Sequence, residues 1–221
     1  MASKRVAVVL TGCGFLDGAE IHEAVSTLLA LDQAGASYQV FAPDKPQMHV
    51  VDHVRGEPSG EQRNVLTESA RIARGHVKPL ALLKMTEFDA VVLPGGYGAA
   101  KNLIDYAVKG AACGIDPEMD RVLKEAHAAR KPIGAICIAP MVVARSLGAD
   151  HHPLLTIGTD PATARDIEKL GGRHQNAPVR EIVVDEANRI VSTPAYMCAQ
   201  RIDEVWDGIS KLVRKVIDLC G

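Results

Sequence analysis

The sequence of 221 residues lacks three features that would each assign it to a class of protein. Its 25 basic and 27 acidic residues nearly balance, so no general attraction to nucleic acid or to an anionic membrane is expected. Its five cysteines include no C-x-x-C pair, which argues against a zinc site and a disulfide framework and favours a reducing, cytoplasmic location. The first apolar run, residues 6–10, is too short for a signal peptide or a membrane helix. Any partner must therefore be recognised at a specific site.

The order of apolar and amphipathic segments predicts an α/β fold. Apolar runs expected to form strands precede segments of helical periodicity along most of the chain. The run that ends at Pro94 is unbroken, which is typical of a central parallel strand buried on both faces. Residues 181–185 and 189–193 are predicted to pair as a small antiparallel hairpin. We therefore expect one domain over residues 1–221, with a mostly parallel sheet and helices on both faces.

The first helix is expected to begin with a capping box between Asp17 and Glu20. In such a box, Asp17 accepts hydrogen bonds from the amides of the first turn and Glu20 reaches back to the cap. The apolar residues Ile21, Ala24, Val25, Leu28 and Leu29 follow at a spacing that fits a helix. They are predicted to face the core.

One cysteine lies where a predicted strand ends and a predicted helix begins. The segment from Ile133 to Ile136 is apolar, Cys137 follows it, and a helical pattern opens at Ala139. A sulfur in this position faces the unpaired N–H groups and partial positive charge of a helix N-terminus, which favour the thiolate and can hold an oxyanion. A buried cysteine is more often only a small apolar residue, but this position makes Cys137 the candidate nucleophile.

Other turns are expected to meet Cys137, because sites in open α/β sheets lie outside the carboxyl ends of the strands. Gly95 and Gly96 follow a central strand, and their bare backbone N–H groups can approach a substrate closely, as an oxyanion hole requires. The amide of Ile138, next to the thiol, is a third donor of this kind. The turn after the first strand leads to the helix that carries two carboxylates.

Glu23 is the stronger of these two carboxylates as a catalytic candidate. The capping box explains Glu20, whereas Glu23 lies beside the apolar face with no structural role of its own. A partly buried, protonated carboxyl there could donate to a thiolate or shuttle a proton, and the alternative is an ordinary solvated glutamate. His22 points about 100° away round the helix. Glu20, His22 and Asn102 are therefore secondary candidates.

The sequence predicts neither a bound cofactor nor a metal. Gly12, Gly14 and Gly18 do not match a dinucleotide fingerprint, because the third glycine is misplaced and no acidic residue closes the next strand. The pair His151 and His152 has no carboxylate or thiol at ligand spacing, so a turn is the better interpretation.

Three features of the sequence resemble the DJ-1/PfpI superfamily, which shares its core with class I glutamine amidotransferases. They are the glycine-rich stretch of residues 91–103, the sequence Gly-Ala-Ile-Cys-Ile-Ala-Pro around Cys137, and Glu23 in the first helix. Further segments, among them residues 155–160 and 192–197, are similar to the ElbB/ES1 branch of the superfamily. These similarities span nearly the whole chain.

The resemblance implies a flavodoxin-like three-layer sandwich, a homodimer and a cofactor-independent glyoxalase of the glyoxalase III type. Such an enzyme converts glyoxal to glycolate, or methylglyoxal to lactate, through a cysteine hemithioacetal. The resemblance also implies protein deglycase activity and a link to isoprenoid biosynthesis. The alternative is a redox-sensing or client-binding protein that uses the same cysteine without significant turnover.

Two departures from the superfamily's patterns disfavour other functions. Ile138 follows the cysteine where PfpI-type proteases have histidine, and the late His-x-Glu of the amidotransferases is absent. The protease and glutaminase interpretations therefore lack a base. Ala139 stands where amidotransferases have glycine, and its small side chain is compatible with the tight turn.

Overall fold

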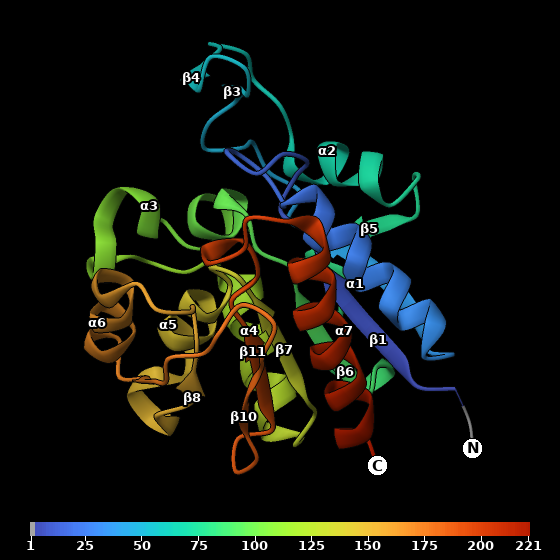
Figure 1. Cartoon of the computed structure of the whole chain (residues 1–221). Helices are drawn as coiled ribbons and strands as arrows, with labels where there is room; N and C mark the ends of the chain where they lie inside the picture. Colours follow the sequence, from blue (N-terminus) through green and yellow to red (C-terminus); the bar gives the residue numbers. More distant parts are fainter. Residues whose placement is uncertain (1–2) are drawn as a thin grey trace.

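A seven-stranded sheet with helices on both faces forms the body of the computed structural model, which describes residues 3–221 (Figure 1). The strand order is β10-β11-β7-β6-β1-β2-β5. The bounds are Arg5–Val9 for β1, Ser37–Ala42 for β2, Val77–Pro79 for β5, Ala90–Leu93 for β6, Ile133–Ile136 for β7, Val183–Asp185 for β10 and Ile190–Thr193 for β11. All neighbours pair in parallel except β10 and β11, which pair antiparallel. The predicted parallel sheet with one hairpin is confirmed.

The helices form two layers, one on each face of the sheet. Because successive side chains of a strand point to opposite faces, β1 contributes Val6 and Val8 to one core and Ala7 and Val9 to the other. The first core lies under α1 (Ile21–Gln33), α2 (Val65–Ile72) and α7 (Ile202–Leu219). The second lies under α4 (Pro117–Ala128), α5 (Pro140–His151) and α6 (Pro161–Lys169), near the short α3 (Tyr106–Lys109). This is a flavodoxin-like three-layer sandwich.

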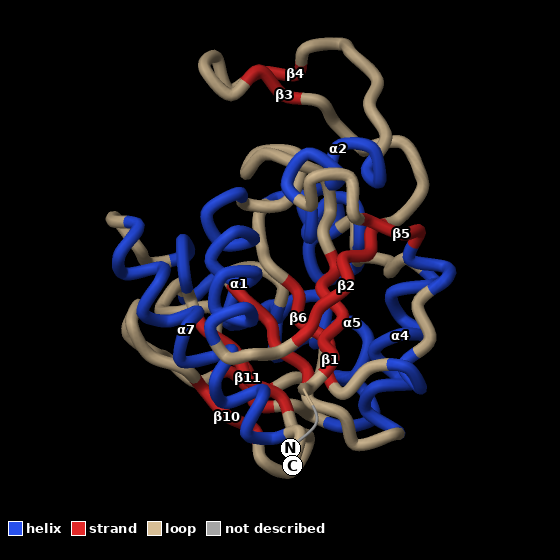
Figure 2. The backbone as a smooth tube through the Cα atoms, turned by 90° about the vertical axis from the view of Figure 1, so that its right-hand side faces the viewer, coloured by secondary structure: helices blue, strands red, loops and turns tan. Residues whose placement is uncertain are grey.

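Short elements connect these layers. The strands β3 (Val51–Asp52) and β4 (Glu57–Pro58) pair antiparallel in a hairpin that stands away from the body of the fold (Figure 2). The strands β8 (Leu154–Leu155) and β9 (Arg173–His174) pair in parallel. Single helical turns cover Leu80–Leu82 (η1), Met85–Glu87 (η2), Gly110–Ala112 (η4) and Ala195–Met197 (η5), and Ala99–Leu103 (η3) forms a π-helical turn.

The predicted capping box at the start of α1 is wrong. The helix begins at Ile21, and Glu20 is its cap, with a carboxylate oxygen 2.7 Å from the backbone nitrogen of Glu23. Asp17 instead accepts a hydrogen bond of 2.7 Å from the amide of Val51, next to the β3–β4 hairpin. The reason is a turn closed by the Gly18 amide and the Gly14 carbonyl, which separates Asp17 from the helix.

The predicted core face of α1 is only partly correct. Ala24 is buried and Leu28 packs against the core as predicted, but Ile21, Val25 and Leu29 are 41%, 50% and 46% exposed, and Thr27 is buried instead. The helix packs closely against α7 and the sheet, and small side chains permit that approach. Glu23 lies on this buried side of the helix and therefore points into the fold.

The last helix, α7, packs along the sheet with one apolar stripe. Val205, Ile209, Leu212 and Val216 are fully buried, and Ile202 at the start of the helix is exposed. A one-sided stripe of this kind belongs to a helix at a surface. Within residues 3–221, no helix combines the length and the apolar character that crossing a bilayer would need.

Candidate active site

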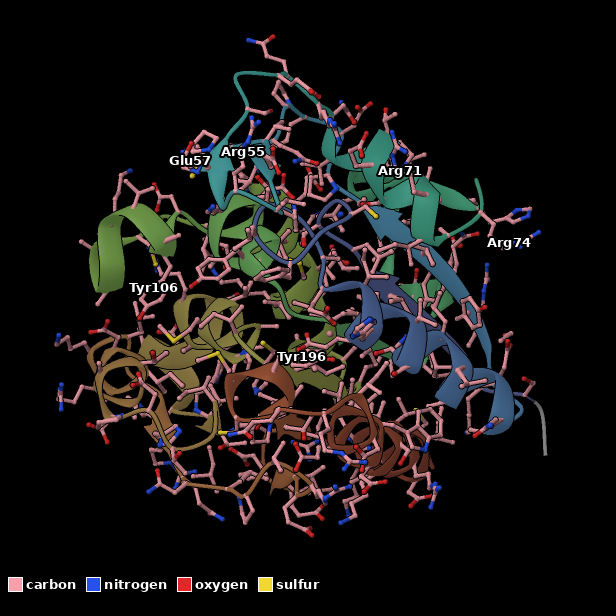
Figure 3. All side chains as sticks on the ribbon, turned by 45° about the horizontal axis from the view of Figure 1, so that its top comes forward. Arg55, Glu57, Arg71, Arg74, Tyr106 and Tyr196 are labelled. Carbon is pink, nitrogen blue, oxygen red and sulfur yellow. The ribbon has the colours of Figure 1, made fainter. Side chains whose placement is uncertain are left out.

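The loops after four strands meet at one edge of the sheet. Because β1, β6, β7 and β11 run parallel, their carboxyl ends lie together. The loop after β1 leads into α1 and Glu23, the loop after β6 contains Gly95 and Gly96, Cys137 follows β7, and Tyr196 follows β11. Figure 3 views this end of the molecule, with Tyr196 near the centre. The structure thus brings together the nucleophile, the carboxyl and the glycines that the sequence singles out.

Cys137 lies on a sharp turn between β7 and α5. Its backbone is left-handed, with φ at 61°, a conformation that non-glycine residues rarely adopt. The turn is fixed on both sides, because the Cys137 amide donates to the Thr193 carbonyl at 2.9 Å and the Ala139 amide donates to the Ile136 carbonyl at 2.9 Å. The strained residue therefore holds its sulfur at the edge of the sheet, where it lines a cavity.

The sulfur of Cys137 is buried among two amides and a carboxyl. The backbone N–H groups of Gly96 and Ile138 donate to it and favour its charged form. Burial, followed by the negative charge of Glu23, has the larger effect and raises the pKa of the Cys137 thiol well above its usual value. The thiolate expected from the helix N-terminus is therefore not the resting form. The amides of Gly96 and Ile138 are placed to stabilise negative charge once it develops at the sulfur.

Glu23 is fully buried and bonded only to neutral groups. One carboxyl oxygen accepts from the Gly95 amide at 3.0 Å, and the other accepts from the Tyr196 amide at 3.2 Å. The carboxyl also forms a hydrogen bond with the Cys137 thiol. Burial, helped by the charge of Glu20, raises the pKa of Glu23 to about 8, although the two amides and the thiol act in the opposite direction. At neutral pH this carboxyl holds a proton that it can exchange.

Gly95 has a different role from the one predicted. Its amide is engaged by Glu23 and is not free to bind an oxyanion. A Cβ at this position would lie 2.5 Å from the Cys137 Cβ and 2.8 Å from a Glu23 carboxyl oxygen. Glycine is therefore what allows the carboxyl and the thiol to meet, and the amides that face the sulfur are those of Gly96 and Ile138.

Two of the secondary candidates lie at the cavity. Glu20 is 8% exposed and lines it, and burial raises the pKa of its carboxyl. His22 lines it as well, and its Nδ1 is 2.7 Å from the hydroxyl of Tyr196. His22 therefore lines the same cavity as the Cys137 thiol, although it points about 100° away from Glu23 round the helix.

The third secondary candidate, Asn102, is a structural residue. Its side-chain amide donates to the carbonyls of Thr11 and Asp17 at 3.0 and 3.1 Å, and its oxygen accepts from the Met48 amide at 3.0 Å. These bonds occupy the side chain and tie together three loops. Asn102 does not line the cavity.

Tyr196 is the main site residue that the sequence does not predict. The sequence predicts a site at the turns after three strands, and residues 189–193 only as one half of a hairpin. However, β11 also pairs in parallel with β7, so the turn after it lies at the same edge. That pairing is the signal that could have identified Tyr196, whose backbone amide holds Glu23.

A cavity of about 690 Å³ opens beside the thiol. Its walls are mostly aromatic and aliphatic, and they come from α1, α3, α6 and the loops at the sheet edge. The lining residues are Phe15, Glu20, His22, Gly96, Tyr97, Ala100, Tyr106, Ala107, Cys137, Ile138, Thr163, Tyr196 and Met197. In the part of the chain that the structure describes, no three His, Cys, Asp or Glu side chains are grouped so that they could hold a metal ion.

Comparison with known proteins gives relatives that are similar over nearly the whole chain. A human protein named glutamine amidotransferase-like class 1 domain-containing protein 3, mitochondrial, is 50% identical over 98% of this chain and 84% of its own length. The zebrafish protein ES1, mitochondrial, is 37% identical over 96% of this chain and 85% of its own length. These names contradict the cytoplasmic location expected from the sequence. Unpaired cysteines indicate a reducing compartment but do not identify it.

A solved structure agrees with these relatives. The isoprenoid biosynthesis protein with amidotransferase-like domain from Ehrlichia chaffeensis is 42% identical, with a TM-score of 0.90 over 97% of this chain and 99% of that one. The family description DJ-1/PfpI matches residues 4–193, a range that holds the thiol, the carboxyl and the strands that position them. This protein belongs to the DJ-1/PfpI family.

Proposed function

We propose that this protein is a cofactor-independent glyoxalase that converts glyoxal to glycolate and methylglyoxal to lactate. The observation that carries the proposal is the buried carboxyl of Glu23, with a pKa of about 8, hydrogen-bonded to the thiol of Cys137. A group with a pKa near the working pH can both take up and release a proton, which this reaction requires at successive steps.

In the first step, the sulfur of Cys137 adds to one aldehyde carbon. A carbon–sulfur bond forms, the carbonyl π bond breaks, and Glu23 in its ionised form, which a pKa of about 8 makes accessible, takes the thiol proton and passes it to the new hydroxyl oxygen. The product is a hemithioacetal. The amides of Gly96 and Ile138 donate to the sulfur before the reaction, and they stabilise the negative charge that passes from sulfur to oxygen.

In the second step, the hydrogen on the carbon bonded to sulfur moves to the neighbouring carbonyl carbon. Glu23, as a carboxylate, removes it as a proton and returns it to the other carbon, while the hydroxyl proton on the sulfur-bearing carbon moves to the neighbouring oxygen by way of an enediol. The result is a thioester. Water cleaves the thioester to the hydroxy acid and restores the thiol, so the reaction consumes one water and needs no external oxidant or reductant.

The alternatives fit the site less well. Cleavage of an amide needs a proton donor for the leaving amine, and Ile138 stands where a histidine would supply it. Redox sensing favours an exposed thiol of low pKa, whereas Cys137 is 7% exposed and burial raises its pKa. Deglycation of proteins would use the same thiol and carboxyl on an adduct carried by a side chain. We extend to this protein, also as proposals, a homodimeric state and a link to isoprenoid biosynthesis, the latter from the Ehrlichia protein's name.

The direct test is Cys137→Ala, assayed by formation of glycolate from glyoxal. Turnover should fall to the background rate, because no other group in the proposal forms the carbon–sulfur bond. Cys113→Ala is the matched control, since Cys113 is also buried, at 3% exposure, but belongs to the core under α4, α5 and α6 and does not line the cavity. It should retain turnover within about twofold, as expected for a residue outside the site. Glycolate formation by Cys137→Ala would overturn the proposal.

A further inference from the structure

The cavity beside Cys137 is far larger than glyoxal. Glyoxal has four non-hydrogen atoms, whereas a volume of about 690 Å³ is in the range that holds much larger ligands. We propose that the preferred substrate is a neutral 2-oxoaldehyde whose ketone carbon carries an aromatic or branched apolar group. This inference rests on the proposed glyoxalase function and assigns the substrate class.

The aromatic residues of the chain are concentrated at this cavity. The sequence has only eight of them, three Phe, four Tyr and one Trp. Four line the cavity, namely Phe15, Tyr97, Tyr106 and Tyr196. They come from four separate parts of the chain, so their convergence is a property of the fold. Aromatic walls favour stacking with a flat apolar group, which glyoxal does not have.

Two of the tyrosine hydroxyls at the cavity, those of Tyr106 and Tyr196, are bonded to the protein. The hydroxyl of Tyr106 lies 3.0 Å from a carboxylate oxygen of Asp166 on α6, and that of Tyr196 lies 2.7 Å from Nδ1 of His22. Burial, followed by the bond to Asp166, raises the pKa of Tyr106 to about 12, so this ring stays neutral. With the hydroxyls held at the walls, the ring carbons are the part left to contact a ligand.

The charges around the cavity disfavour anionic substrates. Among the described residues that line it, none is lysine or arginine. Lys101, which lies 5.4 Å from the ring centre of Tyr97, instead donates to the Leu16 carbonyl at 2.8 Å. The carboxyl of Glu20 faces the cavity, and a phosphorylated or carboxylated aldehyde would be repelled whenever that group is ionised. The substituent on the substrate is therefore apolar rather than acidic.

One wall of the cavity is formed by α3 and α6. Ala107 and Thr163 line it there, and the bond from Tyr106 to Asp166 joins the two helices. Figure 3 shows Tyr106 on the α3 side and Tyr196 near the centre of the view. A substrate whose aldehyde carbon reaches Cys137 would place its apolar group between these tyrosines.

The test compares phenylglyoxal with glyoxal. Phenylglyoxal has an aromatic ring on the ketone carbon, and the same hydrogen shift followed by hydrolysis converts it to mandelate. We expect its kcat/KM to exceed that for glyoxal at least tenfold. Rates obtained with Cys137→Ala are subtracted, because 2-oxoaldehydes also react with exposed arginines.

Ala107→Phe tests where the ring binds. Ala107 is exposed on α3, so a larger side chain there is compatible with folding. The phenylalanine should occupy the part of the cavity that α3 and α6 line. It should lower the phenylglyoxal-to-glyoxal ratio of kcat/KM at least tenfold. Val108→Phe is the matched control, because Val108 is the next residue of the same helix, is 64% exposed and does not line the cavity. It should leave the ratio unchanged.

The outcomes separate this inference from the proposed function. If neither aldehyde is consumed in a Cys137-dependent way, the glyoxalase function fails and the substrate class fails with it. If glyoxal is consumed as efficiently as phenylglyoxal or better, the glyoxalase function stands and the substrate class is overturned. If Ala107→Phe and Val108→Phe change the ratio equally, the assignment of the ring to the α3 and α6 side is overturned.

Discussion

Two buried carboxylates, in the first turns of α1 and α2, have opposite surroundings. Glu68 in α2 is 5% exposed, and its carboxylate lies 2.7 Å from Arg71 and 3.6 Å from Arg63. Glu23 in α1 is fully buried, and its partners are the amides of Gly95 and Tyr196 and the thiol of Cys137. The two residues have the same chemistry and nearly the same burial, but only Glu68 is paired with cations.

The difference shows what makes a buried carboxyl a proton carrier. A cation beside a carboxylate favours the ionised form, whereas burial without a cation favours the protonated form. The amide donors lower the pKa of Glu23, but by less than burial raises it, so the pKa still reaches about 8. Burial alone therefore does not distinguish Glu23 from Glu68. The difference is that the partners of Glu23 are neutral.

The largest expected effect comes from replacing the two carboxyls in turn. Glu23→Gln removes the exchangeable proton and should lower kcat for glyoxal by about 10²–10⁴-fold. Glu68→Gln should leave kcat within about twofold and lower the free energy of unfolding by about 1 kcal/mol, since its arginine partners are largely solvated. Steady-state kinetics and urea unfolding of both variants measure these effects. Equal losses of kcat in the two variants would contradict the comparison.

A side chain at Gly95 should disrupt the neutral surroundings of Glu23. In Gly95→Ala, the new Cβ would meet the Cys137 Cβ at 2.5 Å and separate the carboxyl from the thiol. A misplacement on the order of 1 Å is expected to lower kcat/KM by about 100-fold. Gly114→Ala is the control, because its Cβ would meet nothing closer than 3.8 Å and its backbone needs no positive φ. Normal glyoxal turnover by Gly95→Ala would show that this contact is not required.

The protonated Glu23 should also make stability depend on pH. Its pKa is about 4.5 in a solvated carboxyl and about 8 in the folded protein, so between these values the native state holds a proton that the unfolded chain has released. The resulting stabilisation is complete below pH 4.5 and is lost as pH rises to 8, by up to about 1.4 kcal/mol per pH unit. Urea unfolding from pH 5 to 8 should show this slope in the unaltered protein and in Glu68→Gln. The slope should be absent from Glu23→Gln, and its persistence there would assign it to another group.

The smallest expected effect is that of Tyr196→Phe. The variant loses the hydroxyl bonded to His22 but keeps the backbone amide that holds Glu23. One lost hydrogen bond at a partly exposed position should lower the free energy of unfolding by about 0.5–1.5 kcal/mol. Glyoxal turnover should change by less than about threefold, since the chemistry depends on the amide. A loss of tenfold or more would mean that the hydroxyl itself takes part.

The sequence predicts the parts of the site that follow from strand ends and helix periods. Cys137 is identifiable because an apolar run stops and a helical pattern starts on either side of it, and Glu23 because capping does not account for it. The amide of Tyr196 is not identifiable in this way, since every residue but proline has one and only the path of the chain aims it at the carboxyl. The raised pKa of Cys137 was missed because burial is a property of the folded molecule, and it outweighs the helix N-terminus.

The fold was predicted more completely than the orientation of its first helix. Alternating strands and helices specify a parallel sheet with two covering layers, whatever the details of packing. The face of α1 was misjudged in part, because Val25 and Leu29 lie on the solvent side while Ala24, Thr27 and Leu31 pack inward. Periodicity places an apolar stripe on the helix, but packing against α7 and the sheet decides which residues of that stripe are buried.

The bond between the Tyr196 amide and Glu23 joins residues that are 173 positions apart. During synthesis, α1 and its residue Glu23 emerge from the ribosome long before β11 and the turn that contains Tyr196. Until residue 196 has emerged and β11 has paired with β7, the pocket around the Cys137 thiol is incomplete. The Glu23 carboxyl then lacks the Tyr196 amide, one of its two amide donors. The proposed reactivity toward aldehydes thus requires that β11 has already joined the sheet.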